Sequence, residues 1–225
     1  MSFAAVADPW LGEVMRRPVF RVEGSGSAEA VVQGRGFYFA KVPTDRIADV
    51  QALSRAGFTV VDTNVTFELT REIAPAHNVD VGEIRAGEED AVLAIAGSAF
   101  RYSRFHLDPE VGLDLAHHIK REWIRNYVLR KRGDTLLVAR QGGRPAGFLA
   151  PIVAHGTAVI DLVAVATDAH VQGLGSALTA AFANKYRGMP RLVGTQVANM
   201  PSIRLYTKLG FALAKSQYVL HHHAT

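Results

Sequence analysis

A glycine-containing turn between two apolar segments is the part of this sequence best suited to chemistry. Residues 158–165 are apolar apart from one Asp, and half of them are β-branched, which predicts a strand. Residues 176–186 are rich in Ala and predict a helix. Gly173 and Gly175 lie between them. The first N–H groups of a helix have no partner within the helix, and the helix dipole favours an anion there. The segment therefore predicts a phosphate-binding loop.

The spacing of this loop excludes two common phosphate-binding motifs. A dinucleotide fingerprint needs a third glycine and an acidic residue about twenty positions further on, but Leu178 and Val193 occupy those neighbourhoods. A P-loop would end in Gly-Lys followed by Ser or Thr, and this ending is missing. The ligand is therefore expected to be neither a dinucleotide nor a nucleoside triphosphate held in these ways.

The loop resembles motif A of the GNAT superfamily of acyl-CoA-dependent N-acetyltransferases, Gln/Arg-x-x-Gly-x-Gly/Ala. His170 stands where the family usually has Gln or Arg, and Gly173 and Gly175 match the two later positions. Downstream, Asn199 is followed seven residues later by Tyr206 and then by Lys-x-Gly-Phe, which resembles motif B. The resemblance implies acetyl-CoA as co-substrate. We assign its binding to Val163, Val165, His170, Gln172, Gly173, Leu174, Gly175, Ser176, Asn199 and Tyr206.

Acetyl transfer needs a deprotonated amine, a stabilised oxyanion and a proton for the departing CoA sulfur. The resemblance implies that the backbone N–H of Val165 stabilises the oxyanion. Tyr206 is the predicted general acid, and a core tyrosine is the alternative. Asp161 precedes Val163 and Val165 by two and four residues, so strand alternation predicts its side chain on their side of the sheet, as a candidate base. A paired structural acid, with solvent taking the proton, is an equal alternative, and Asn199 could equally be a helix N-cap.

The acceptor is predicted from a narrower resemblance, to acetyltransferases of the dTDP-fucosamine type. These acetylate a nucleotide-linked 4-amino-4,6-dideoxy sugar in cell-surface polysaccharide synthesis. Residues 99–105, 123–126 and 195–199 carry this resemblance. The acceptor-binding residues that we assign are Arg104, Phe105, Trp123 and Gln196. The planar guanidinium of Arg104 suits the oxygens of a diphosphate, although it could equally be surface charge.

Two parts of unequal size are predicted in the chain. Residues 77–225 contain strands and helices in the order β-α-α-β-β-β-α-β-α-β, and the resemblance implies an α/β fold with a GNAT-type mixed, splayed sheet flanked by helices. Residues 1–76 form the smaller part, with a boundary at Pro75. Residues 52–58 resemble residues 205–211, because each reads as a short helix, a glycine cap and a strand that starts with Phe. We therefore predict a truncated GNAT-like N-terminal domain that extends the sheet or shapes the acceptor pocket, with chance similarity as the alternative.

Composition narrows the class of protein. The chain has 225 residues, a formal net charge of +4 and no cysteine, which excludes disulfides, thiolate metal sites and a cysteine nucleophile. No apolar run reaches membrane-spanning length and the start does not resemble a signal peptide, so we expect a cytoplasmic protein without membrane contact.

The Lys and Arg residues are scattered, which favours polyanionic small molecules over nucleic acid as the partner. Residues 130–132 read as a solvated helix end and residues 221–223 as the polar end of the last strand. The predicted partner is a small-molecule amine acceptor, with a homodimer left open.

Two other functions remain open at this level. One is a GNAT acetyltransferase that acts on a protein or peptide amine or on an aminoglycoside. The other is a non-catalytic CoA-binding protein, for which His170 is the only hint and against which Tyr206 argues. An acidic groove would favour the first, whereas the basic balance of this chain does not.

Overall fold

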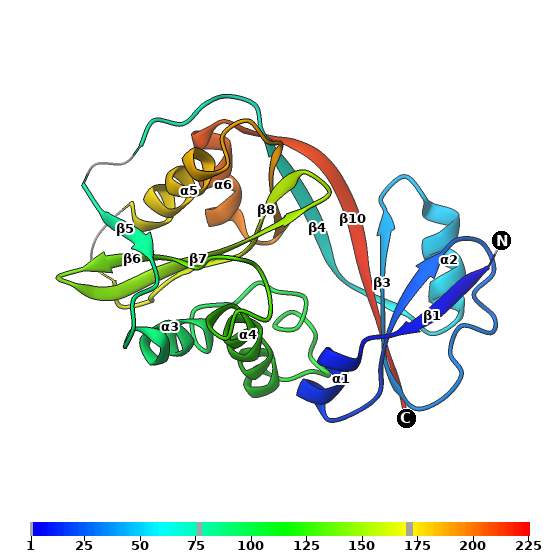
Figure 1. The fold of residues 1–225 in the computed structure, drawn as a ribbon. Coiled ribbons are helices and arrows are strands. Elements are labelled where there is room, and N and C mark those ends of the chain that lie inside the picture. The colour runs from blue at the N-terminus through cyan, green and yellow to red at the C-terminus, as the bar shows by residue number, and fades with distance from the viewer. Residues whose placement is uncertain (1, 76–77, 170–172) are drawn as a thin grey trace.

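The computed structural model describes residues 2–75, 78–169 and 173–225. In these ranges one mixed sheet of ten strands runs in the order β1-β2-β3-β10-β4-β9-β8-β7-β6-β5 (Figure 1). The strands are β1 (Phe3–Ala7), β2 (Val19–Gly24), β3 (Gly36–Pro43), β4 (Thr59–Leu69), β5 (Asp80–Glu83), β6 (Leu137–Gln141), β7 (Arg144–Ala154), β8 (Thr157–Val165), β9 (Arg191–Gln196) and β10 (Phe211–Ala224). The helices are α1 (Pro9–Met15), α2 (Ile47–Arg55), α3 (Glu89–Ala96), α4 (Leu113–Val128), α5 (Leu174–Lys185) and α6 (Met200–Leu209). None of the helices in the described ranges is long and apolar enough to cross a membrane.

Helices cover both faces of the sheet in its larger part. Figure 1 shows α5 and α6 on one face and α3 and α4 on the other. One apolar core surrounds Leu178 and Phe182 of α5, and a second surrounds Leu93 of α3 and Ile124 of α4. This layering confirms the predicted α/β class.

The sheet splays open between β8 and β9. These parallel strands pair only where residues 158–160 face residues 191–193. The N–H of Ala166 donates to the carbonyl of Ala146, 2.8 Å away, and bonds in an antiparallel ladder alternate along a strand. The amides of Val163 and Val165 therefore face away from β7, toward the gap.

A β-bulge in β8 changes the direction of Asp161. Ala150 pairs with Leu162 and Pro151 pairs with Ile160, which leaves Asp161 without a partner in the ladder. The extra residue reverses the alternation, so Asp161 faces α4 whereas Val163 packs against the core under α5. The prediction that Asp161 shares a side of the sheet with Val163 and Val165 is therefore wrong, because simple alternation assumes an unbroken ladder.

The N-terminal part contributes a strand to the centre of the sheet. Gly57 (φ +89°) follows α2 and Gly210 (φ +93°) follows α6, and each leads into a long strand, β4 or β10. Both glycines adopt the left-handed conformation that closes a helix. The two strands lie side by side and antiparallel, with β4 between β9 and β10. The sheet thus continues without a break across the predicted boundary at Pro75.

Candidate active site

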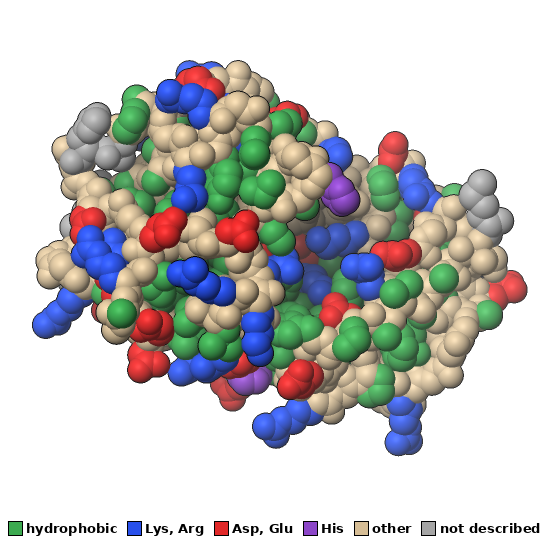
Figure 2. Space-filling model, viewed as in Figure 1, with side chains coloured by type: hydrophobic (Ala, Val, Ile, Leu, Met, Phe, Trp, Pro, Cys, Tyr) green, Lys and Arg blue, Asp and Glu red, His purple; other side chains and the backbone are tan. Residues whose placement is uncertain are grey.

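A groove of about 1260 Å³ passes through the splay of the sheet. One wall comes from β8, β9 and the start of α6, and the other comes from residues 99–105 and α4. The N-terminal part adds residues of β3 and β4, Lys41 and Asn64 among them. Figure 2 shows Lys and Arg side chains in the hollow between the two parts of the molecule.

The predicted phosphate loop leads into α5. Gly173 precedes the helix with φ +92° and has open space where a side chain would lie. The N–H of Ala177 donates to the carbonyl of Gly173, so the N–H groups of Leu174, Gly175 and Ser176 have no partner within the helix. Among the described residues, no side chain caps this end of α5. The free N–H groups and the helix dipole fit the diphosphate of CoA.

Two predicted CoA contacts, His170 and Gln172, lie outside the described residues. Gly175 lines the groove, and a side chain there would start 3.3 Å from Leu205 of α6. A glycine at this position therefore lets α5 and α6 approach each other closely.

Tyr206 lines the groove from α6. Its side chain is only 2% exposed and packs against Phe67 and Phe211. Burial raises the pKa of Tyr206, which keeps the phenol protonated. Among the described residues, none forms a hydrogen bond with its hydroxyl. The arrangement suits a proton donor in the groove.

Asn199 and Gln196 also line the groove, near the end of β9. Asn199 is the N-cap of α6: its Oδ1 accepts from the N–H of Ser202 at 3.3 Å and its Nδ2 donates to Thr195 at 3.2 Å. Both polar groups of Asn199 therefore serve the fold, which is the capping alternative considered from the sequence. Gln196 is half-buried beside its strand neighbour Asn64.

Asp161 is held by three side chains of the α4 segment. Its Oδ2 accepts from Trp123 Nε1 at 2.9 Å, from the Tyr127 hydroxyl at 2.7 Å and from Arg132 Nε at 2.7 Å, and its Oδ1 accepts from Arg132 Nη2 at 3.1 Å. Burial acts to raise the pKa of Asp161, but the bonds and charge of Arg132 with the two aromatic donors outweigh it, and the pKa lies below its usual value. A carboxylate so occupied is a poor base. The geometry favours the structural alternative, and Arg132 is part of an ion pair rather than a solvated helix end.

Arg104 is a cation packed between aromatic rings. Its Cζ lies 3.9 Å from the centroid of Phe39 and 4.3 Å from that of Phe105, and its Nη1 donates to His221 Nε2 at 3.1 Å. Burial lowers the pKa of Arg104 to about 9, so it stays charged at neutral pH. Because it lines the groove in this fixed position, Arg104 is not ordinary surface charge.

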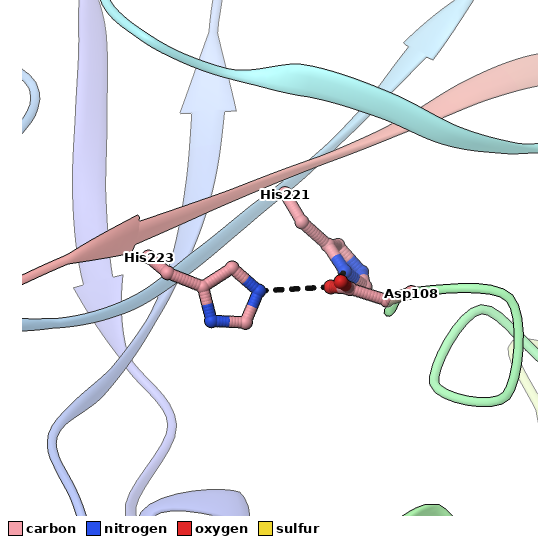
Figure 3. Close-up of side chains that lie close together, drawn as sticks. All are labelled: Asp108, His221 and His223. Carbon is pink, nitrogen blue, oxygen red and sulfur yellow. Dashed lines mark hydrogen bonds and ion pairs between the residues drawn. The ribbon is translucent and has the colours of Figure 1, made fainter. Parts of the chain in front are cut away.

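A hydrogen-bonded chain that reaches Arg104 through His221 was not foreseen from the sequence. Figure 3 shows its Asp108, His221 and His223. Asp108 Oδ2 lies 2.6 Å from His221 Nδ1 and 2.8 Å from His223 Nε2, and Arg17 Nη2 lies 3.2 Å from His223 Nδ1. A guanidinium only donates, so each histidine accepts from its arginine and donates its N–H to Asp108. Burial lowers the pKa of His221 to about 4, so this ring is neutral.

The spacing of the two histidines is the sequence signal that could have found this chain. Residues 221–223 do lie in the last strand, as predicted, but His221 and His223 alternate with His222 and so share one face. That face is turned toward Asp108, in the loop before α4. Two histidines two residues apart in a strand therefore indicate a shared partner.

Comparison with known proteins identifies the family. The model of the Acetyltransferase (GNAT) family matches residues 92–211, more than half of the chain. The chain belongs to this family. Acetyl-CoA is the acyl donor of GNAT acetyltransferases, as the resemblance to motifs A and B implied.

Three further comparisons describe what this GNAT protein is similar to. It is 30% identical over 147 residues to the spore coat polysaccharide biosynthesis protein SpsD of Bacillus subtilis (strain 168), with 63% of this chain and 50% of that protein covered. The chain therefore spans about half the length of this curated relative. A functionally unknown conserved protein from Staphylococcus epidermidis superposes with a TM-score of 0.69 at 14% identity, covering 92% of this chain and 85% of the other. A GCN5-related N-acetyltransferase from Kribbella flavida superposes with a TM-score of 0.59 at 15% identity, covering 91% and 80%. The two structures support the fold.

Proposed function

We propose that this GNAT protein transfers the acetyl group of acetyl-CoA to the amine of a nucleotide-linked 4-amino-4,6-dideoxy sugar. The observation that carries the proposal is Arg104, a buried guanidinium fixed between rings in the same groove as the phosphate loop of α5. One groove thus offers two separate places for diphosphates, one for CoA and one for the acceptor. The polysaccharide role in the name of the Bacillus relative supports a sugar acceptor.

Two groups of the protein, the N–H of Val165 and the hydroxyl of Tyr206, account for the transfer. Acetyl-CoA supplies an activated acyl group when it is bound. The N–H of Val165, which faces the gap, donates to the carbonyl oxygen as negative charge develops on it. Tyr206, kept protonated by burial, donates its proton to the departing sulfur. With Asp161 occupied by its three partners, the amine loses its proton to water in the open groove.

The acceptor would lie along the side of the groove lined by residues 99–105 and α4. Arg104 would bind the diphosphate, and the ring of Phe105 packs against its guanidinium. Trp123 and Gln196 line the groove where the sugar must approach the gap in the sheet. Trp123 also holds Asp161, so its ring is fixed in place.

Acetyl-CoA at a hundred times its dissociation constant should stabilise the protein by about 2.7 kcal/mol, a rise of a few degrees in Tm. Gly173→Glu should abolish this rise, because it puts a carboxylate where the diphosphate approaches the backbone. Gly188→Glu is the matched control, since Gly188 has φ +89°, open space and an exposed turn away from the groove. Thermal unfolding with and without acetyl-CoA measures both variants. An unchanged Tm for the wild-type protein would contradict CoA binding.

Arg104→Ala should raise the KM for the sugar nucleotide at least tenfold with a smaller effect on kcat, because a diphosphate contact stabilises ground and transition states alike. The KM of Arg104→Lys should lie between those of the wild-type protein and Arg104→Ala, because lysine keeps the positive charge but lacks the planar guanidinium. Arg121→Ala, exposed on α4, is the control.

A thiol-release assay with nucleotide amino sugars, peptides and aminoglycosides measures these constants and tests the acceptor class. Activity confined to peptides or aminoglycosides would overturn the sugar assignment and leave acetyl transfer intact.

A further inference from the structure

Lys120 of α4 is a buried amine without an ion-pair partner among the described residues. It is 7% exposed, and its Nζ lies 5.0 Å from the ring centroid of Trp123, 5.1 Å from that of Phe100 and 6.0 Å from that of Phe105. The rings surround the stem and the amine, while Lys120 still lines the groove. An aromatic cage favours the ammonium form only modestly, so the charge lacks a full partner.

Two more cations act on the same stretch of groove. Lys41 of β3 and Arg104 each oppose the charge of Lys120 and lower its pKa, and Arg104 also lowers the pKa of Lys41. Both residues line the groove. Lys120 and Arg104 also lie over the same ring, at 6.0 Å and 4.3 Å from the centroid of Phe105. Three positive groups therefore line this groove.

The nearby carboxylates do not balance this charge. Asp161, which raises the pKa of Lys120, already pairs with Arg132, and Asp108 accepts from two histidines. Asp62 of β4 acts on Lys41 and Arg104, and burial raises its pKa to about 6. The charge of Asp8 raises the pKa of Arg104 and is not among the causes that shift the pKa of Lys41 or Lys120. Positive groups in the groove thus exceed the carboxylates that are available to pair with them, and an anionic ligand could pair with the excess.

We propose that Lys120, together with Lys41 and Arg104, forms the acceptor's diphosphate subsite, and that Lys120 takes up a proton when the diphosphate binds. This inference rests on the proposed function and adds two lysines and a proton to it. The ligand class is a nucleoside diphosphate sugar, whose two phosphates each carry one negative charge. The phosphate oxygens would supply the partner that the Lys120 ammonium lacks.

The proton uptake follows from the charges around Lys120. Burial lowers the pKa of Lys120 to about 7, and Arg104 and Lys41 act in the same direction against Asp161. A bound diphosphate adds two negative charges and so raises this pKa. At pH 8 the free amine is mostly neutral and the bound one is charged, so binding should take up close to one proton. At pH 6 Lys120 is already charged, and its uptake should be close to zero.

The test uses the full chain saturated with CoA, so that the phosphate loop of α5 is occupied, and thymidine diphosphoglucose as a ligand that has no amine to acetylate. Titration calorimetry in two buffers of different ionisation enthalpy measures the protons taken up at pH 8 and pH 6. We expect uptake of close to one proton at pH 8, and an affinity that falls several-fold between pH 6.5 and 8.5. At pH 6 we expect only a smaller uptake, which comes from Asp62, because the diphosphate also raises the pKa of this carboxyl from about 6.

Substitutions at Lys120 test whether the proton taken up on ligand binding goes to this residue. Lys120→Met should abolish the uptake at pH 8 and raise the Kd at pH 6 by about tenfold. Lys120→Arg should bind without uptake at pH 8, because a guanidinium stays charged. Lys131→Met, exposed after α4, should behave as the wild-type protein does.

Two results would overturn the inference in distinguishable ways. If the wild-type protein binds the ligand, Arg104→Ala weakens binding and no proton is taken up at pH 8, then Lys120 is outside the subsite while the proposed acceptor stands. If the CoA-saturated wild-type protein does not bind the ligand at all, both the subsite and the proposed acceptor fail. The wild-type measurement decides the matter even where a Lys120 variant does not fold.

Discussion

Replacing Tyr206 by Phe is expected to lower kcat by two to four orders of magnitude, about 3 to 5 kcal/mol of barrier. The substitution removes a hydroxyl without a hydrogen-bonding partner among the described residues and keeps the ring that packs on Phe67 and Phe211. Stability and the affinity for acetyl-CoA should therefore barely change. Steady-state kinetics and thermal unfolding, with and without acetyl-CoA, measure the three quantities.

The matched control is Tyr186→Phe, at the C-terminal end of α5 and away from the groove. It removes the same atom and should leave kcat unchanged. Turnover within a few fold of wild type in the Tyr206 variant would make Tyr206 structural, and the proton would have to reach the sulfur from another group or from water.

Asp161→Ala is expected to lower the free energy of unfolding by roughly 2–4 kcal/mol, because it leaves the donors of Trp123, Tyr127 and Arg132 without their acceptor. The lower end of this range applies if Arg132, whose side chain is 36% exposed, forms hydrogen bonds with water in place of Asp161. Urea unfolding measures the loss. Asp114→Ala, exposed in the first turn of α4, should cost less than about 1 kcal/mol.

A double-mutant cycle separates the structural role of Asp161 from a catalytic one. Arg132→Ala in the Asp161→Ala background should cost little more than Asp161→Ala alone, because the two residues share one interaction. A variant at Asp161 with wild-type stability and greatly reduced kcat would instead restore Asp161 to the role of base.

The phosphate loop that we propose for CoA could be predicted from the sequence because its geometry is local. A glycine before a helix exposes backbone N–H groups whatever the rest of the chain does, so Gly173, Gly175 and the start of α5 follow from neighbouring residues alone. The same holds for the glycine corners before β4 and β10, since a left-handed residue after a helix is a local requirement. The ends of α4 have local causes too, because Gly112 (φ +77°) precedes the helix and Arg130 (φ +55°) follows it.

The environment of the charged residues was decided by the tertiary structure. A bulge in β8 depends on how β7 pairs with it, so nothing within residues 157–165 shows that Asp161 faces α4. Arg132 meets Asp161 across 29 residues, because α4 packs against β8. His221 meets Asp108 across 113 residues, and the place of His221 depends on the pairing of β10 with β3 and β4. By itself the sequence determined the glycine turn that leads into α5, because that turn depends only on neighbouring residues. The packing of distant elements decided which charges are free to bind a ligand, because burial and ion pairing depend on neighbours that lie far away along the chain.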